Sequence, residues 1–244
     1  MTSVLVDAYR TIIPARDDRH GPLPPLLLIL TTVTGLVDAV SYLRLGHVFV
    51  ANVTGNVVFL GFAIAGANDL SAAASLVALA GFMVGASAAG RVGAQFEHHR
   101  GRRLAVVIVI KLAFVAAATV VAVLAGDHLT DAARYALIVL LAFAMGAQNA
   151  TARKLSVPDL TTTVLTLTIT GLAADSRLAG GNSPHAGRRL VAVLAMLLGA
   201  LVGGLLVFRV NIAAPLGFTT GLLLLAGITA AQLSVAEAPW ANPT

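Results

Sequence analysis

The sequence predicts an all-α fold, a polytopic membrane helix bundle that is internally duplicated and has six spanning helices plus two re-entrant or broken helices. Three observations predict it. Of the 244 residues, 58% are hydrophobic and only 11% are charged, against roughly 25% charged residues in an average soluble domain, and the mean hydropathy is +0.89. Apolar segments run from residue 24 to residue 236 with only short polar breaks. The order of these segments also repeats once along the chain.

Eight apolar segments can be marked, and two of them differ from ordinary spans. A spanning helix needs about 20 residues, whereas the sixth segment has 15 and carries a threonine at nearly every other position. The second segment is interrupted by Asn52, Thr54, Gly55 and Asn56. We therefore expect the second and sixth segments to be re-entrant or broken. In order, the segments are Pro24–Leu43, Val48–Ala67, Ala72–Gly90, Leu104–Ala125, Tyr135–Ala152, Leu160–Ala174, Leu190–Phe208 and Ile212–Ala236.

Lysine and arginine positions discriminate between six and eight spans, because cytoplasmic loops carry the excess of these residues. If all eight segments span, seven fall on the amino-terminal side and eight on the other. If the second and sixth segments dip in and return, the split becomes twelve against three, with Lys111 inside a span. Six spans are favoured, and eight spans remain the alternative.

An internal repeat is visible when the halves are aligned. Leu76–Gly90 matches Leu190–Gly204 without gaps at six positions, and Gly35, Asp38 and Ala39 fall opposite Gly146, Asn149 and Ala150. With three spans and one re-entrant segment in each half, the halves are inverted relative to each other. Inverted repeats with interrupted helices near the midplane are typical of transporters.

These boundaries divide one membrane domain into three parts. Residues 1–23 form a cytoplasmic amino-terminal tail, residues 24–125 the first membrane repeat and residues 132–236 the second. The first apolar run has no convincing small-x-small cleavage site, so we interpret it as a retained span and not as a signal peptide.

Asp38 is the sharpest functional candidate. An aspartate within a span costs about 2.5 to 3.5 kcal/mol on insertion scales and usually faces the bundle interior or a water-filled cavity. Asp38 is therefore a candidate cation or proton site. The alternative is a fixed interhelical hydrogen bond or ion pair with Arg44, Lys111 or Asn149. An Asp38–Lys111 ion pair fits the eight-span topology, because only there do both residues approach from one membrane face.

Further polar residues in both halves are candidates for binding a substrate or ion. Asn52, Thr54 and Asn56 flank a glycine where the backbone can leave the helix, and irregular backbone at membrane depth occurs only where it is buried in protein or lines a cavity. Gln148 and Asn149 are their counterpart in the second half. The alternative is that these side chains only tie helices together.

Threonines and a lysine favour structural interpretations. The stripe of Thr163, Thr166 and Thr170 is expected to bond back to carbonyl oxygens four residues earlier. Lys111 is expected to extend toward the loop over residues 91–103. Glycines at four-residue spacing let helix backbones approach closely in lipid, or serve a homodimer. They are Gly81, Gly85, Gly199, Gly203, Gly217 and Gly221.

Several classes of function are disfavoured. The chain has no cysteine, its six histidines lack zinc-ligand spacing, and no phosphate-binding loop is present. We expect no enzyme activity, no cofactor and no metal site. The net charge of +5 is explained by topology, so no nucleic-acid partner is expected. The expected partners are the lipid bilayer and an unknown small solute or ion, with a homodimer possible.

Two motifs resemble a known family. The stretch TGLVDAVSYLRLGHVFVANVTGNVVFLG resembles the amino-terminal signature of the YoaK-like family of bacterial inner-membrane proteins, a family of unknown function, and GAQNATAR resembles its second signature. The resemblance implies a multi-pass protein of the bacterial inner membrane. A second Thr-Gly expected in the later half appears here as Thr166-Leu167. The family pattern falls on Gly35, Asp38, Ala39, Tyr42, Phe49, Asn52, Thr54, Gly55, Asn56, Gly146, Gln148 and Asn149.

Two hypotheses of different classes follow. The first is a small-solute or ion transporter or channel, with Asp38, Asn52, Thr54, Asn56 and the Gln148-Asn149 pair near a central site between inverted halves. The second is a non-transporting membrane scaffold or assembly partner, in which the same groups only fix the fold. An intramembrane enzyme is disfavoured, because no nucleophile or metal site can be identified.

Overall fold

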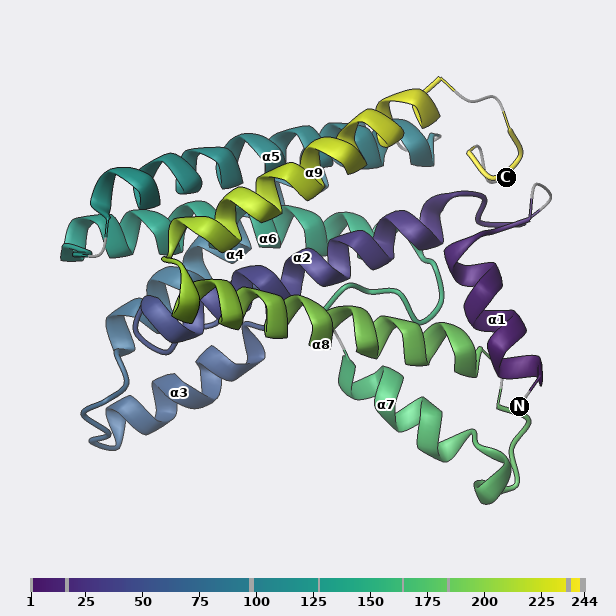
Figure 1. Ribbon diagram of the computed structural model, residues 1–244, viewed down its shortest axis with the longest axis horizontal. Helices are drawn as coiled ribbons and strands as arrows, with labels where there is room; N and C mark the ends of the chain where they lie inside the picture. Colours follow the sequence, from purple (N-terminus) through teal and green to yellow (C-terminus); the bar gives the residue numbers. More distant parts are fainter. Residues whose placement is uncertain are drawn as a thin grey trace.

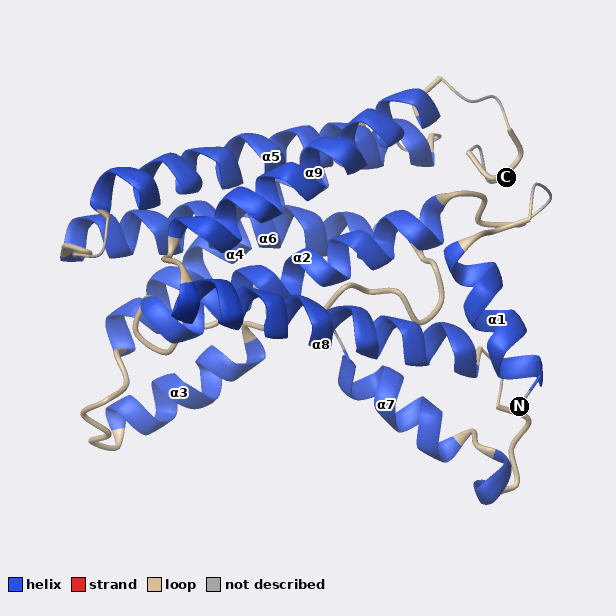
Figure 2. Ribbon diagram, in the orientation of Figure 1, coloured by secondary structure: helices blue, strands red, loops and turns tan. Residues whose placement is uncertain are grey.

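The structure is a computed structural model that describes residues 2–15, 18–96, 99–126, 128–163, 165–183, 185–235 and 238–241. Within these ranges the chain is helical with connecting loops and contains no strand (Figure 2). In chain order the elements are α1 (Thr2–Ile12), α2 (Leu23–Arg44), α3 (Thr54–Ile64), α4 (Ala72–Ala94), α5 (Arg100–Ala125), α6 (Asp131–Leu155), α7 (Leu165–Ala174), the 3₁₀ turn η1 (Arg177–Ala179), α8 (Ala186–Arg209) and α9 (Ala213–Leu233).

Six helices of the described chain are long and apolar enough to cross a membrane, namely α2, α4, α5, α6, α8 and α9. The two remaining apolar helices are short: α3 has 11 residues and α7 has 10. They occupy the second and sixth apolar segments. The prediction of an all-α bundle with six spanning helices and two broken segments is confirmed.

Each broken segment begins with non-helical backbone. Gly46 and His47 have positive φ angles before α3, and Ser156, Asp159 and Thr162 have positive φ angles before α7. Left-handed backbone is uncommon for residues other than glycine. The first part of each apolar segment, Val48–Ala67 and Leu160–Ala174, is therefore a loop despite its apolar composition.

The long helices pack in a crossed arrangement. The largest helix contacts join α4 to α6, α2 to α8, and α5 to both α9 and α6. Each short helix lies beside the following long helix, α3 on α4 and α7 on α8. Figure 1 shows α3 near the end of the bundle where α5 turns into α6, and α7 near the opposite end, where α1 lies.

Glycines set the two closest helix crossings. A Cβ atom at Gly199 of α8 would lie 2.0 Å from the carbonyl oxygen of Thr32 in α2, and one at Gly35 would lie 2.3 Å from that of Met196. In the other crossing, a Cβ at Gly85 of α4 would lie 2.1 Å from the carbonyl oxygen of Phe143 in α6. No larger residue fits these places, because distances under 3.0 Å require the backbone to shift.

The other glycines of the predicted packing set divide into two groups. Gly81 faces the Ala142 methyl group at 3.2 Å and Gly203 faces that of Ala39 at 2.9 Å, as measured from a built Cβ. At Gly217 the nearest atom would be 4.0 Å away, and at Gly221 none lies within 4 Å. The Gly217 and Gly221 pair therefore makes no close helix crossing with any described part of the chain.

The amino-terminal tail contains a helix that the sequence analysis does not anticipate. Helix α1 packs on α8, and a Cβ at Gly187 would lie 2.2 Å from the carbonyl oxygen of Val4. Its opposite side exposes Leu5, Tyr9 and Ile12. A helix with one such apolar face is typical of segments that lie in the membrane interface.

Candidate functional site

The carboxylate of Asp38 holds the loop that precedes α3. Its Oδ1 accepts hydrogen bonds from the backbone N–H groups of Val50 at 3.1 Å and Ala51 at 2.9 Å. Its Oδ2 accepts one from the backbone N–H of Asn52 at 3.2 Å and another from the Asn52 side-chain amide. Asp38 is 6% exposed. An aspartate in the last third of α2 thus provides the acceptors that a broken segment needs inside a bilayer.

Asn56 fixes the same loop from the other side. Its Oδ1 accepts from the backbone N–H of Phe49 at 2.8 Å, and its amide nitrogen donates to the Phe49 carbonyl oxygen. The Phe49 ring stacks on Tyr42 of α2 with ring centroids 5.1 Å apart, and on Phe59 of α3 at 5.8 Å. The Asn56 side chain thus makes the hydrogen bonds to the Phe49 backbone that a neighbouring strand or helical turn would otherwise make, so the loop has a defined conformation.

The second half uses the same spacing with weaker groups. Asn149 of α6 accepts a hydrogen bond from the Thr163 hydroxyl, and the two residues are 14 apart, as Asp38 and Asn52 are. Asn149 also donates to the carbonyl oxygen of Met145 at 2.9 Å. The predicted backbone bond of Thr163 is therefore replaced by a bond to Asn149, and a neutral amide stands where the first half has a carboxylate.

Gln148 and Lys111 form a polar centre between the halves. The Gln148 amide nitrogen donates to the hydroxyl groups of Thr34 at 2.9 Å and Thr162 at 3.0 Å, and it lies 3.4 Å from the Leu30 carbonyl oxygen. Its carbonyl oxygen accepts from the Lys111 ammonium. Lys111 is 1% exposed. A buried ionisable residue at membrane depth is a functional candidate by default.

Two sequence expectations for Lys111 differ from the structure. The side chain does not extend toward the loop over residues 91–103, because it is enclosed between α5 and α6 and bonded to Gln148. Within the described residues, Asp38 and Lys111 form no ion pair. The Asp38 carboxylate instead bonds to the loop before α3, and this arrangement accompanies the six-span topology.

Two hollows lie at equivalent places in the two halves. The first, of about 310 Å³, is lined by Asp38 and Asn52 together with Met196 and Ala200 of α8. The second, of about 570 Å³, is lined by Asn149 and Thr161 together with Phe82 and Ala86 of α4. Phe82 and Ala86 fall opposite Met196 and Ala200 when Leu76–Gly90 is aligned with Leu190–Gly204. Both hollows have a polar side beside the broken segment and an apolar side on the crossing helix.

Not every predicted residue joins this arrangement. Thr54 is the first residue of α3 and its side chain is exposed, so it lies outside the polar contacts that hold the loop. Asp38, Asn52 and Asn56 are brought together, and Gln148 with Asn149 forms a separate cluster in the second half.

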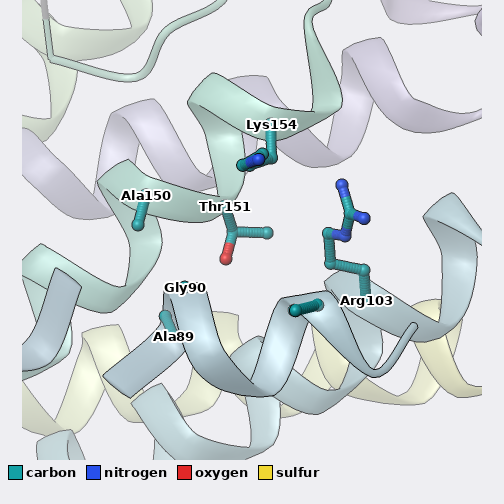
Figure 3. Close-up of a pocket in the computed structure, with 8 residues that line it drawn as sticks. Ala89, Gly90, Arg103, Ala150, Thr151 and Lys154 are labelled. Atoms are coloured by element: carbon teal, nitrogen blue, oxygen red, sulfur yellow. The ribbon is translucent and has the colours of Figure 1, made fainter. Parts of the chain in front are cut away.

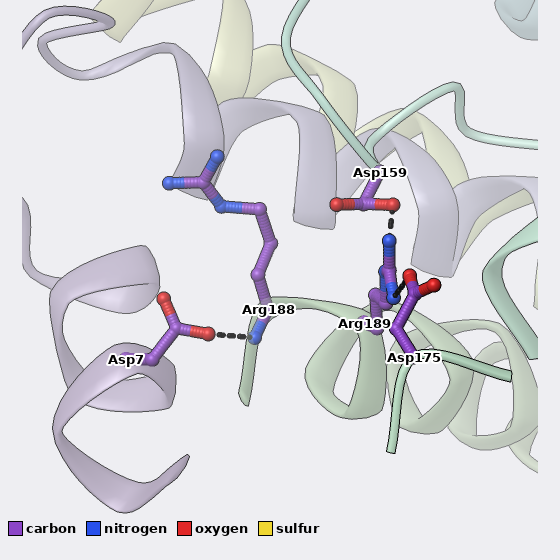
Figure 4. A network of polar contacts seen from close by, with 5 residues as sticks. All are labelled: Asp7, Asp159, Asp175, Arg188 and Arg189. Atoms are coloured by element: carbon purple, nitrogen blue, oxygen red, sulfur yellow. Dashed lines mark hydrogen bonds and ion pairs between the residues drawn. The ribbon is translucent and has the colours of Figure 1, made fainter. Parts of the chain in front are cut away.

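The structure also contains polar features that the sequence did not suggest. Arg189 of α8 donates to Asp159 at 2.9 Å and to Asp175 at 2.7 Å, and these ion pairs fix the loops before and after α7 (Figure 4). A pocket of about 40 Å³ between α4, α5 and α6 is lined by Arg103, Thr151 and Lys154 (Figure 3). Across the part of the chain that the structure describes, no group of three or more histidines and carboxylates could hold a metal ion.

Comparison with known proteins places this architecture in a family. Residues 26–229 match the family described as "Protein of unknown function (DUF1275)". The chain belongs to the DUF1275 family. It is also 35% identical over 150 residues to a "UPF0700 transmembrane protein YoaK" of Bacillus subtilis (strain 168). That match covers 62% of this chain and 65% of the relative, slightly less than two thirds of the relative's length.

Family membership confirms the YoaK-like resemblance that the sequence motifs indicate. Together with the six long apolar helices it identifies an integral, multi-pass membrane protein. No solved structure matches the chain.

Proposed function

We propose that this DUF1275 protein is an inner-membrane transporter or channel for a small solute or ion, built from two membrane repeats of opposite orientation. The observation that carries the proposal is the pair of equivalent hollows, each beside a broken segment that a polar side chain holds from the preceding long helix. Paired interrupted segments in the two halves point to the binding site of a transporter.

The helix contacts support the repeat in this proposal. Helix α4 crosses α6 at Gly85, and α8 crosses α2 at Gly199. These glycines fall opposite each other in the alignment of Leu76–Gly90 with Leu190–Gly204. A duplication accounts for this pattern, because each half then supplies one helix to each of the two crossings.

The proposed role of Asp38 is that of a switch for the first broken segment. Its two oxygens accept four hydrogen bonds from Val50, Ala51 and Asn52. Protonation of Asp38, or binding of a cation to its carboxylate, would remove at least one of these acceptor positions and loosen the loop beside the first hollow. This couples the charge of one residue to the position of a gate-like segment.

Transport can be tested in proteoliposomes that contain the full chain. The probes are a trapped pH-sensitive dye for protons, sodium and potassium gradients, and radiolabelled amino acids, sugars and nucleosides. The proposal expects protein-dependent entry of at least one probe that Asp38→Asn lowers at least about tenfold, the loss that corresponds to about 1.4 kcal/mol. Asp69→Asn, a change at an exposed loop aspartate, is the matched control. Flux that Asp38→Asn leaves unchanged would refute the role of Asp38.

A second candidate function is a non-transporting scaffold or assembly partner. The observation that favours it is the use of all polar atoms of Asp38 and Asn56 in holding one loop. This candidate expects Asp38→Asn to lower the melting temperature in detergent while proteoliposomes with and without protein pass every probe at equal rates.

A further inference from the structure

Three basic groups meet where the amino-terminal ends of three spans come together. His20 precedes α2, Arg100 is the first residue of α5, and Arg188 lies in the first turn of α8. Arg100 is 9% exposed and Arg188 is 8% exposed. Arginine is almost never this deeply buried unless it is paired.

The guanidinium group of Arg188 has no protein partner within the described chain. The backbone N–H of Arg188 donates to Asp7 at 2.9 Å, but its side chain extends away from that carboxylate (Figure 4). The buried Nε atom makes no hydrogen bond to any described residue. A guanidinium carries five N–H donors, and an uncompensated buried charge costs several kcal/mol. The site thus lacks a negatively charged hydrogen-bond acceptor for this guanidinium.

Arg100 adds to this surplus of positive charge, and His20 lies against it. Arg100 donates to the Leu155 carbonyl oxygen, and its guanidinium lies 3.5 Å from Nδ1 of His20. Burial lowers the pKa of His20, and the positive charges of Arg100 and Arg188 lower that pKa further. Asp18 opposes this effect, yet the printed contact between the two residues is from the His20 backbone N–H to the Asp18 carboxylate at 2.7 Å.

No described carboxylate pairs with either arginine. The ion pairs within the described ranges join Arg134 to Asp131 and Arg189 to two aspartates. Arg19 adds another positive charge near Arg100 and lowers the pKa of His20 as well. The two buried arginines therefore lie together beside His20 with no described carboxylate paired to either of them.

The position of α1 sets the depth of this cluster in the bilayer. Helix α1 packs against the start of α8 through Gly187, and its free side exposes Leu5, Tyr9 and Ile12. An amphipathic helix with such a face lies at the boundary between headgroups and acyl chains. The cluster also lies on the side that carries twelve of the fifteen lysines and arginines other than Lys111, the cytoplasmic side by the positive-inside rule.

We propose that Arg188, Arg100 and His20 bind the phosphate group of an anionic phospholipid at the cytoplasmic surface of the bundle. Arginine binds phosphate through two parallel N–H···O bonds, and basic pockets between spans on this side of a membrane hold anionic headgroups. The phosphate supplies the acceptors that the buried Nε and its guanidinium lack. A free phosphate offers the same chemistry from a different source.

The single tryptophan of the chain reports on this place. Trp240 is 8% exposed, and its ring lies against Gly21, where a Cβ atom would be only 2.5 Å from Trp240 Cγ. The next residue, Ala241, accepts a hydrogen bond from the backbone N–H of Arg100 at 2.8 Å. Tryptophan fluorescence of the purified full chain in a maltoside detergent, which contains no phosphate, therefore follows occupancy of the cluster.

The titration uses dioleoylphosphatidylglycerol, dioleoylphosphatidylcholine and inorganic phosphate as separate probes. The proposal expects a saturable fluorescence change with phosphatidylglycerol, a much weaker one with the zwitterionic lipid, and binding to Arg188→Gln that is about tenfold or more weaker. Arg209→Gln is the matched control, because Arg209 is an exposed arginine at the opposite end of the same helix. It is expected to bind as the unchanged protein does.

The outcomes separate the possible sources. Saturation by inorganic phosphate, with the same loss in Arg188→Gln, would support the site with a free phosphate as its ligand. Equal binding by Arg188→Gln and Arg209→Gln, equal binding of both lipids, or no saturable change with any probe would overturn the proposal. If Arg188→Gln does not fold, Arg188→Lys keeps the charge without the guanidinium fork, and a loss of affinity in that variant decides the question.

Discussion

Replacing Asp38 with asparagine should destabilise the protein by an amount that follows from its four hydrogen bonds. The asparagine oxygen can still accept from the backbone N–H groups of Val50 and Ala51, but its NH₂ group would face the two N–H donors of Asn52. Two hydrogen bonds to a charged acceptor are lost, at about 1.5 to 3 kcal/mol each. Since a buried carboxylate no longer has to be desolvated, we expect a net loss of about 2 to 4 kcal/mol in the free energy of unfolding.

The assay is thermal unfolding of the full chain in detergent, followed by circular dichroism at the helix signal. For a chain of this size, 1 kcal/mol corresponds to about 2 to 4 °C, so the melting temperature of Asp38→Asn should fall by about 5 to 15 °C. Asn149→Ala removes the hydrogen bond from the Thr163 hydroxyl and the one to the Met145 carbonyl oxygen, and it should cost about 1 to 3 kcal/mol at about 0.5 to 1.5 kcal/mol for each neutral bond. Asp69→Asn should stay within about 0.5 kcal/mol. A melting temperature of Asp38→Asn within about 2 °C of the unchanged protein would refute the argument that this carboxylate holds the loop.

Two further predictions concern helix packing and pH. Gly199→Ala should lower the melting temperature strongly or prevent folding, because its Cβ would lie 2.0 Å from the Thr32 carbonyl oxygen. Gly221→Ala should be tolerated in the same thermal assay, since no described atom lies within 4 Å of a Cβ at that position. Burial and the neighbouring arginines lower the pKa of His20 from 6.5, so folding favours the neutral imidazole. The contribution of His20 to stability is therefore present above pH 6.5, and it is lost as the pH falls from 6.5 toward the lower pKa of the folded state. The melting temperature should therefore fall between pH 7.5 and pH 5.5, and His20→Gln should reduce that fall; an unchanged pH dependence would contradict the assignment.

The two broken segments could be predicted because the sequence marks them differently from spans. Asn52 and Asn56 interrupt one apolar segment, and the segment ending at Ala174 is too short to cross a bilayer. The partners of these residues could not be predicted in the same way. That Asp38 would bind backbone N–H groups of residues 50–52, and not Lys111, depends on where the loop returns relative to α2.

Other features were missed for physical reasons that the sequence does hint at. Helix α1 lies in the predicted tail, where Asp7 and Arg10 make the composition polar, although Leu5, Tyr9 and Ile12 have helical spacing. The bonds of Arg189 to Asp159 and Asp175 join residues from three segments, so no local sequence pattern predicts them. The hollows could not be predicted from composition, because their walls come from α2 and α8 in one case and from α4 and α6 in the other.

Six spans and two halves of opposite orientation are tested most directly by cysteine labelling. The chain contains no cysteine, so single substitutions Arg10→Cys, Asp69→Cys and Arg177→Cys give a clean background at three exposed positions. In intact cells, a membrane-impermeant thiol reagent added from outside should label only the cysteine at position 69. Equal labelling at all three positions would contradict the six-span topology, make the halves parallel, and remove the main support for a transport site.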